Sequence, residues 1–572
     1  MAMMNGEGSP RIPAGLETSR GPSDLSLSLG DLQGRVDGRL VAWAKADYLR
    51  RLWARDPGLW TPGPAAGVRE RMGWLDLPET MGPRLRGIRS FADEIAGEGF
   101  RHAVVLGMGG SSLAPEVFER TFGHGPGRPD LLVLDSTHPG AVAGVERRVD
   151  LARTLFIVSS KSGTTVEPLS FFRYFWRLVS GASAAPGRQF IAITDPGTPL
   201  TGLARERGFR RVFEAAPDVG GRFSALTEFG LVPAALIGVG VDGLLAGAAA
   251  EARANGPDVP AVEAPGLRLG AALGETGSVR DKLTILTSRG LRSFPDWLEQ
   301  LIAESTGKDG KGIVPVAGEP PLPAARYGAD RTFVSFVLKP DRRGGDARLV
   351  ASLEQAGYPV IGVGLADVLS LGAEIFRWEM AVAAAGSVLG VQPFDQPDVE
   401  LAKELARNAL DRDAGREGKE PISDDAMTAE SAAGLGAAMD RWLGRARRGD
   451  YVAIQAYLAP ERTTASALQE LRSALLRRTG LATTLGYGPR FLHSTGQLQK
   501  GGPDEALVLQ LFDQPESDLA IPETGLTFGR LIRAQAFGDY QALAGRGRRI
   551  LRLDLGRDPA GGLSRLAELA AA

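Results

Sequence analysis

Short apolar runs separated by amphipathic or polar segments form the main pattern of the first 410 residues. Runs that are apolar on both faces and alternate with helical segments are typical of a parallel sheet covered on both faces. The pattern predicts strands at 102–106, 131–134, 154–158 and 190–193. After an Ala- and Gly-rich helical zone around 231–275, it predicts strands at 283–287, 332–338 and 360–363, with helices near 295–304, 349–356 and 369–389. Two α/β units in tandem are the simplest account.

A third, smaller α/β unit is predicted at the C-terminal side of a charged, Gly-containing stretch. Its strands are expected at 451–458, 508–512 and 550–555, with a helix near 528–543. Ser466 and Gln469 form a capping-box pattern that predicts the start of another helix. We therefore expect the following division: a flexible N-terminal segment at 1–35, helices and the first α/β unit at 36–275, the second unit at 276–410, a linker at 411–430 and the C-terminal unit at 431–572.

Composition and charge exclude several classes of protein. The 572 residues hold 66 basic and 68 acidic side chains, a near balance that gives no electrostatic reason to expect nucleic acid. No cysteine is present, which excludes disulfides and thiolate metal sites, and the four scattered His predict no metal. The first 30 residues lack the apolar region of a secretory signal, and Asp242 interrupts the most apolar stretch, 229–250. We expect a soluble, cytoplasmic protein with no membrane partner.

Two segments that follow predicted strands are suited to hold a phosphate. The Gly-rich turn at 107–112, which includes Gly110 and Ser111, opens a helix whose N-terminus favours an anion. Taken alone, it is equally well a structural connection, because the third Gly of a dinucleotide fingerprint is missing. The segment Ser159-Ser160-Lys161-Ser162-Gly163-Thr164-Thr165 places five hydroxyls and one Lys within seven residues. One helix cap needs one hydroxyl, so this segment predicts a site for the phosphate of a small ligand.

Four further segments carry candidate chemistry, although each has a plain structural alternative. Gln300 and Glu304 lie one helical turn apart, and apolar neighbours can raise the pKa of Glu304 towards that of a working base. From spacing alone, a solvated Glu at a helix end is favoured. Arg222 follows two Gly but is one of 57 Arg, so a surface ion pair is favoured there. Lys403 starts a helix, and His493 lies in a Gly-containing loop at 492–503 that suits closure over a polar ligand or a plain turn.

The ordered series GMGGSS, SSKSGTT, GGRFS, ESTGK and FDQPDVELAK resembles the phosphoglucose isomerase family over about residues 40–410. The C-terminal segments LHSTGQLQKGGP and TFGRLIRAQAFGDYQAL resemble the isomerase half of bacterial transaldolase–isomerase fusions, although the chain has no room for a transaldolase barrel ahead of the first strand. The resemblance implies two sugar-isomerase (SIS) domains, each a doubly wound parallel sheet, and no cofactor. Family members are commonly dimers, so a homodimer is one alternative, and a C-terminal unit that completes the site in one chain is the other.

The resemblance also implies roles for individual residues. The catalytic set would be Glu304 as general base, Arg222 for the enediolate charge and Lys403 near the sugar ring. The substrate contacts would be Gly110, Ser111, Ser160, Lys161, Ser162, Thr164, Thr165, Gln300 and Gln396. The family's ring-opening His is missing, because no His lies between His138 and His493. Either His493 takes this role, which we favour, or Lys403 or water does. Gln499 stands where fusion-type relatives have a second His, and we expect His138 to lie in a structural turn.

The activity implied by the resemblance is aldose–ketose isomerisation between glucose 6-phosphate and fructose 6-phosphate through an enediolate. Two alternatives stay open. One is an isomerase that also accepts mannose 6-phosphate. The other is a SIS module that binds sugar phosphates without turnover, for which Glu304, Arg222 and Lys403 together would have no use.

Overall fold

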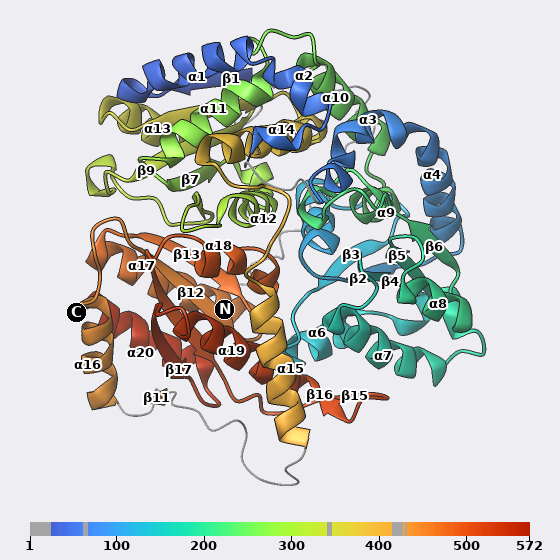
Figure 1. Ribbon diagram of the computed structural model, residues 1–572. Coiled ribbons are helices and arrows are strands. Elements are labelled where there is room, and N and C mark those ends of the chain that lie inside the picture. The colour runs from blue at the N-terminus through green and yellow to red at the C-terminus, as the bar shows by residue number, and fades with distance from the viewer. Residues whose placement is uncertain (1–23, 61–66, 340–345, 415–426, 429–431) are drawn as a thin grey trace, which may run out of the picture.

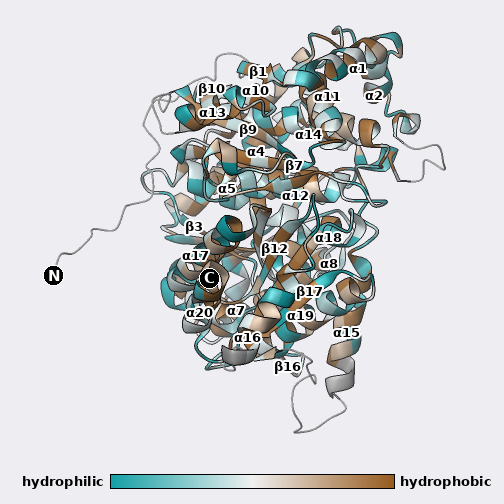
Figure 2. Cartoon of the chain, turned by 90° about the vertical axis from the view of Figure 1, so that its left-hand side faces the viewer, coloured by the Kyte–Doolittle hydropathy of each residue, from teal (hydrophilic) through white to brown (hydrophobic). Residues whose placement is uncertain are grey.

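The computed structural model describes residues 24–60, 67–339, 346–414, 427–428 and 432–572. Three five-stranded sheets, each flanked by helices, lie against one another (Figure 1). Apolar residues gather on the strands and on the helix faces turned towards them, as Figure 2 shows. The expected fold class, two doubly wound α/β units followed by a smaller α/β unit, is confirmed. No helix among the described residues is both long and apolar enough to span a bilayer.

The first sheet is entirely parallel and has the strand order β3-β2-β4-β5-β6. Its strands are β2 (His102–Leu106), β3 (Asp130–Leu134), β4 (Thr154–Ser159), β5 (Phe190–Thr194) and β6 (Arg211–Glu214). The helices of this unit are α4 (Gly82–Gly97), α5 (Leu113–Phe122), α6 (Pro139–Arg148), α7 (Val166–Ser180), α8 (Pro199–Glu206) and α9 (Glu228–Leu236). The strand order reverses between β2 and β4, and ligands bind outside the carboxyl ends of the strands at such a point. Both Gly- and Ser-rich segments begin there.

The second sheet has the order β8-β7-β9-β10-β1. Its strands are β7 (Lys282–Thr287), β8 (Val314–Val316), β9 (Arg331–Leu338), β10 (Val360–Leu365) and β1 (Asp24–Ser28). Its helices are α1 (Gln33–Lys45), α2 (Tyr48–Trp53), α10 (Val241–Ala254), α11 (Pro265–Gly277), α12 (Phe294–Thr306), α13 (Asp346–Gln355) and α14 (Leu371–Leu389); a short α3 (Leu77–Thr80) precedes α4.

Strand β1 corrects the expectation of a flexible segment over 1–35. Residues 24–28 pair antiparallel with β10, and Leu25 and Leu27 pack against the core while the intervening residues face outward. The Ser-rich composition concealed this two-residue alternation, which is what an edge strand needs. Residues 1–23 lie outside the described residues.

The third sheet is parallel, with the order β13-β12-β14-β17-β11. Its strands are β11 (Met427–Thr428), β12 (Tyr451–Tyr457), β13 (Ala482–Tyr487), β14 (Ala506–Phe512) and β17 (Arg549–Asp554), and β15 (Ala520–Ile521) pairs separately with β16 (Leu526–Thr527). Its helices are α15 (Glu400–Ala414), α16 (Ala432–Leu443), α17 (Arg462–Thr479), α18 (Gly496–Gly501), α19 (Phe528–Ala544) and α20 (Pro559–Ala571). Helix α17 begins at Arg462, so the helix start predicted from Ser466 and Gln469 is wrong.

The expected linker at 411–430 lies largely outside the described residues. Of the part that is described, 411–414 belong to α15 and 427–428 form β11, which pairs with β17.

The C-terminal unit shares apolar packing with both other units. Ile521 and Phe528 join the cluster formed by the first sheet, and Tyr451 and Val508 join Val314 of β8 in another. Burial of these shared surfaces fixes the C-terminal unit against the other two units. It therefore positions any side chain that this unit turns towards the first two.

Candidate active site

The hydroxyl-rich segment forms a loop between β4 and the N-terminus of α7. Ser160 donates to Thr165 Oγ1 at 3.0 Å, the hydroxyls of Ser162 and Thr164 lie 3.0 Å apart, and Lys161 Nζ lies 2.6 Å from Asp195. Gly163 has φ +67°, and a Cβ there would lie 2.8 Å from Thr198. The loop therefore needs Gly at this position to close tightly. Hydroxyls, one ammonium and the first amides of a 15-residue helix converge here, a donor set that fits a phosphate.

The Gly-rich turn after β2 lies against the segment that carries Arg222. A Cβ on Gly110 would lie 1.9 Å from the carbonyl oxygen of Gly221, and a Cβ on Gly109 would lie 3.0 Å from both Gln300 and His493. Ser111, beside them, is buried. The two Gly thus allow a close approach of four chain segments, because any larger residue would separate them.

Arg222 and Glu304 form a buried ion pair at the centre of this approach. Arg222 Nη1 lies 3.3 Å from Glu304 Oε2 and donates to Gln396 Oε1 at 3.1 Å, while Nε donates to Ser305 at 2.8 Å. The two side chains are 3% and 9% exposed. Gln300 Nε2 donates to the same Glu304 oxygen at 3.3 Å. The structure therefore brings together Arg222, Gln300, Glu304 and Gln396 from three separate motifs.

Burial raises the pKa of the Glu304 carboxyl above its ordinary value, and the charges of Arg222, His493 and Lys308 and the bond from Gln300 only partly oppose this. A carboxylate with a raised pKa in an apolar, Arg-lined setting has the properties of a general base. Burial likewise lowers the pKa of Arg222. The plain structural alternatives for these two residues, a solvated helix end and a surface ion pair, are wrong.

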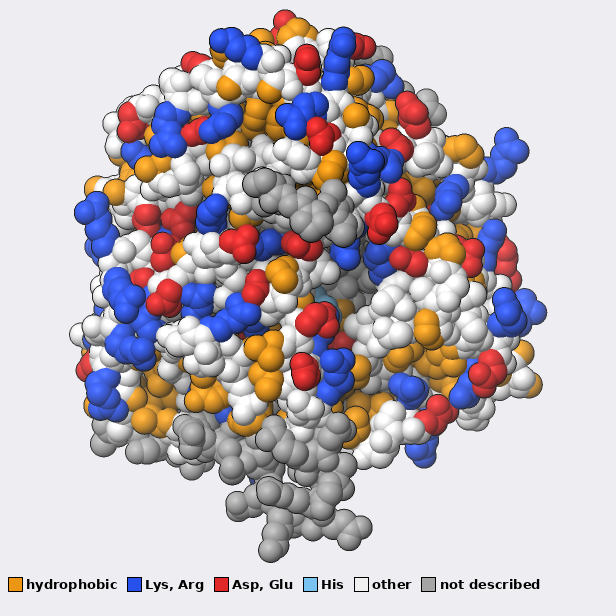
Figure 3. Space-filling view, viewed as in Figure 1, with side chains coloured by type: hydrophobic (Ala, Val, Ile, Leu, Met, Phe, Trp, Pro, Cys, Tyr) orange, Lys and Arg blue, Asp and Glu red, His pale blue; other side chains and the backbone are white. Residues whose placement is uncertain are grey.

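The loop of the C-terminal unit brings His493 to this site within one chain. Gln300 Nε2 donates to the His493 carbonyl oxygen at 2.8 Å, so a single amide bridges His493 and Glu304. The imidazole Nε2 lies 3.3 Å from Glu167 Oε1, two residues beyond the hydroxyl-rich loop at 159–165, and Gln535 donates to that oxygen at 2.7 Å. A series of contacts through His493 and Gln300 thus joins Glu167, just after this loop, to the carboxylate of Glu304. The surface of the face shown in Figure 3 is hollowed near its centre, between the three units.

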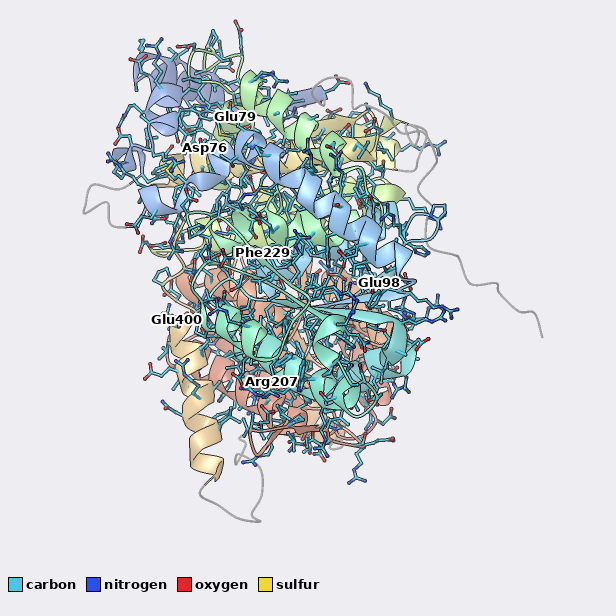
Figure 4. All side chains as sticks on the ribbon, turned by 90° about the vertical axis from the view of Figure 1, so that its right-hand side faces the viewer. Asp76, Glu79, Glu98, Arg207, Phe229 and Glu400 are labelled. Carbon is cyan, nitrogen blue, oxygen red and sulfur yellow. The ribbon has the colours of Figure 1, made fainter. Side chains whose placement is uncertain are left out.

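Lys403, which the family resemblance predicts near the sugar ring, lies in the first turn of α15. Its Nζ pairs with Glu400 at 2.8 Å, and its side chain is 40% exposed. Glu400 stands at the start of α15 (Figure 4). Lys403 is near enough to help lower the pKa of Glu167, but the cation beside Arg222 and Glu304 is instead Lys308.

Three functional candidates escaped the sequence analysis. Lys308, the last residue of ESTGK, is 3% exposed and pairs with Asp395 at 2.8 Å, and burial lowers its pKa to about 7. Lys is rare among the basic residues of this chain, and this rarity is the feature of the sequence that could have pointed to Lys308. Glu167 looked like an ordinary acidic residue of a first helical turn. Gln535 lies in the segment TFGRLIRAQAFGDYQAL, and the resemblance of that segment to isomerase fusions was its signal.

Two other predictions concern residues outside the reacting centre. His138 accepts from the Gly140 N–H through Nδ1 at 3.0 Å and caps α6, so its Nε2 carries the proton that it donates to Asp513 at 3.0 Å. Its structural role is as expected. Gln499 is buried and accepts from Gln455 at 2.8 Å inside the C-terminal unit. Among the described residues, no cluster of three metal-ligating side chains occurs.

Comparison with known proteins gives consistent matches. A family model described as phosphoglucose isomerase matches residues 87–312. The glucose-6-phosphate isomerase of Symbiobacterium thermophilum is 31% identical over 395 residues, which cover 60% of this chain and 86% of that protein. The glucose-6-phosphate isomerase of Desulfitobacterium hafniense is 28% identical over 431 residues, covering 67% of this chain and 77% of that protein.

Two solved structures are similar to the fold. A hypothetical protein from Thermus thermophilus has 25% sequence identity and a TM-score of 0.58, covering 68% of this chain and 100% of that chain. A glucose-6-phosphate isomerase from Chlamydia trachomatis has 22% identity and a TM-score of 0.51, covering 70% and 90%, and this similarity supports the fold alone.

Proposed function

Because the chain belongs to the phosphoglucose isomerase family, we propose that it interconverts glucose 6-phosphate and fructose 6-phosphate through an enediolate. The observation that carries the proposal is the buried Arg222–Glu304 pair, 3.3 Å apart and bridged by Gln300 to His493. A carboxylate with a raised pKa beside a guanidinium is suited to move a proton between adjacent carbons. A module that only binds sugar phosphates would have no use for it.

The phosphate loop supplies remote binding energy. Ser160, Lys161, Ser162, Thr164 and Thr165 would hold the phosphate dianion at the N-terminus of α7, with Lys161 exchanging Asp195 for the ligand. Such binding orients the reacting carbons before chemistry begins.

Ring opening would use the His493 imidazole. The anomeric hydroxyl loses its proton, the bond between the anomeric carbon and the ring oxygen breaks, and the ring oxygen gains a proton. Glu167, held by Gln535, orients the imidazole through the contact between Oε1 and Nε2. Lys403 and water remain the alternatives for this step, and Lys403 is the weaker one, because it pairs with Glu400 at 2.8 Å.

Isomerisation itself would use Glu304 and Arg222. Glu304 removes the C2 proton of the open-chain aldose and returns it to C1, while the enediolate proton moves between the two oxygens. Arg222 stabilises the negative charge on these oxygens, and Gln396 and Gln300 would contact the sugar beside Gly110 and Ser111.

An assay that couples glucose 6-phosphate production to its dehydrogenase tests the function, with fructose 6-phosphate as substrate. Glu304→Gln should abolish turnover but keep sugar-phosphate binding by calorimetry. Glu275→Gln is a matched control, since Glu275 is a buried carboxylate that pairs with Arg39 at 2.8 Å away from the site. Turnover retained in Glu304→Gln would reject the base, and an inactive wild-type protein that binds the sugar would favour the binding module. Mannose 6-phosphate in the same assay decides whether the enzyme is dual.

We further propose that the C-terminal unit is of the type found in bacterial transaldolase–isomerase fusions. We also propose that the enzyme works in the cytoplasm and binds neither nucleic acid nor a membrane. A homodimer is compatible with the site but is not needed for it, since His493 and Glu304 meet within one chain. Sedimentation at assay concentrations tests this point.

A further inference from the structure

Arg490 begins the single helical turn, Arg490–His493, whose last residue is the imidazole described above. Its guanidinium pairs with Glu116 of α5 and, through Nη1 at 3.3 Å, with Asp135 after β3. Its side chain is only 21% exposed, and the charges of Asp135, Glu116 and Asp296 outweigh burial and hold its pKa above the usual value. A residue of the C-terminal unit thus pairs with two carboxylates of the first unit, near Asp296 of the second; we call Glu116, Asp135, Asp296 and Glu299 the carboxylate pocket.

The pocket needs a cation from elsewhere. Burial raises the pKa of Asp135, that of Asp296 to about 6 and that of Glu299 to about 8, and in each case Arg490 opposes the rise. Arg120 of α5 offers a second positive charge, but it pairs with Glu116 and its side chain is 56% exposed. A cluster of buried carboxylates without a paired cation is strongly unfavourable.

The same pocket borders the site on two sides. Asp135 accepts from Ser112 of the Gly-rich turn at 3.2 Å, and Asp296 stands on α12, the helix of Gln300 and Glu304. In a 3₁₀ turn, side chains three residues apart lie along one face, so Arg490 and His493 share a short, stiff unit. Fixing one end of this unit restricts the other.

We propose that Arg490 is a positioning residue that sets the His493 imidazole for ring opening. This inference rests on the proposed function. The two ends of the turn are held independently, Arg490 by the carboxylate pocket and His493 by Gln300 and Glu167. Loss of the Arg490 anchor leaves the imidazole with correct neighbours but a wider range of orientations, and a displacement of about 1 Å can cost on the order of 100-fold in rate.

The test compares a ring-forming with an open-chain substrate in the full-length protein. 5-Deoxyfructose 6-phosphate lacks the hydroxyl that closes the furanose ring and carries phosphate on O6, so it stays open. Its turnover is followed as exchange of the C1 hydrogen with D₂O. Arg490→Met should lower the rate with fructose 6-phosphate roughly 10- to 100-fold and the exchange rate less than about 3-fold. Equal losses on both substrates would overturn the proposal.

A double-mutant cycle separates positioning from general damage. In a His493→Ala background, Arg490→Met should have almost no further effect on the ring-forming substrate, because the group it acts through is gone. A full, multiplicative loss would overturn the proposal. Arg549→Met is the matched control, since Arg549 is a buried Arg of the same unit that pairs with Asp450 at 2.9 Å; it should affect both substrates equally.

A second variant covers the case of misfolding, and the wild-type protein distinguishes failure of the proposed function from failure of the role of Arg490. Should Arg490→Met fail to fold, Arg490→Lys keeps the charge but loses the two-pronged geometry, and the same ratio of losses is expected at smaller size. Wild-type protein inactive on both substrates would refute the proposed function itself. Wild-type activity with no change in the substrate ratio of either Arg490 variant would refute only the role of Arg490.

Discussion

Replacing Arg222 by Met removes the guanidinium that lies 3.3 Å from Glu304, and leaves Gln396 and Ser305 without the donor they share. Two consequences follow for catalysis. The enediolate loses its cation, which for a single oxyanion donor costs about 100- to 1,000-fold in kcat. The Glu304 carboxylate also loses the largest of the influences that lower its raised pKa.

The size of the second effect follows from the distance. Two unit charges 3.3 Å apart interact by about 5 kcal/mol at an effective dielectric constant of about 20, which is an upper limit. Carboxylates beside an Arg typically have their pKa lowered by about 1–3 units, or roughly 1.4–4 kcal/mol. Loss of the Arg should therefore raise the pKa of Glu304 further. Because the base must be ionised, the acidic limb of kcat/KM should move to higher pH.

The assay is the pH dependence of kcat/KM and kcat with fructose 6-phosphate, for the wild type and Arg222→Met. Arg84→Met serves as control, because Arg84 pairs with the buried Glu228 rather than with a site residue, and its limb should stay in place. An acidic limb that stays or moves to lower pH in Arg222→Met would refute the electrostatic coupling. A higher KM with unchanged kcat would refute the stabilisation of the enediolate.

Three further changes probe the phosphate loop, a buried cation and an interface. Lys161→Met should lower kcat/KM about 10- to 100-fold, mostly through KM, and weaken inhibition by inorganic phosphate; an effect on kcat alone would contradict phosphate binding. Burial lowers the pKa of Lys308 to about 7 from 10.5 in the unfolded chain, so the unfolded state binds more protons between these values. The free energy of unfolding of the wild type relative to Lys308→Met should therefore rise with pH across this window, by at most about 1.4 kcal/mol per unit, in urea titrations from pH 7 to 10; a flat or falling difference would contradict it. His138→Ala removes a helix cap and leaves Asp513 unpaired, so it should lower the unfolding free energy by about 2–4 kcal/mol while the folded enzyme keeps its kcat; an unchanged urea midpoint would contradict this.

Much of the fold could be predicted because its central strands are continuous apolar runs. β2, β4 and β5 are buried on both faces, and such runs carry a strong signal. The sequence did not predict β6 or β8. β6 is an exposed edge strand of Arg-Val-Phe-Glu, and β8 is only three residues long and contains Pro315. Polar residues in β13 hid that strand in the same way.

Site residues could be predicted where several polar residues lie close together in one segment. They could not be predicted where contacts between distant segments determine the position of a side chain. The segment at 159–165 has more hydroxyls than a cap requires, and the family resemblance ordered Arg222, Gln300 and Glu304. Neither the hydroxyl-rich segment nor the family resemblance predicts that Lys403 pairs with Glu400. They also do not predict that Glu167 contacts residues more than 300 positions away in the chain. These contacts depend on how the third unit docks, which local sequence does not encode.

The docking of that unit also sets an order in time. A ribosome makes residues 1–492 before it reaches His493, so the phosphate loop and the carboxylate of Glu304 are synthesised well before their imidazole. A nascent chain at that stage contains Glu304, Arg222 and Glu167 but lacks the imidazole that we propose for opening the ring. On the proposed mechanism, completion of the last unit therefore adds ring opening to a site whose isomerising groups were made earlier.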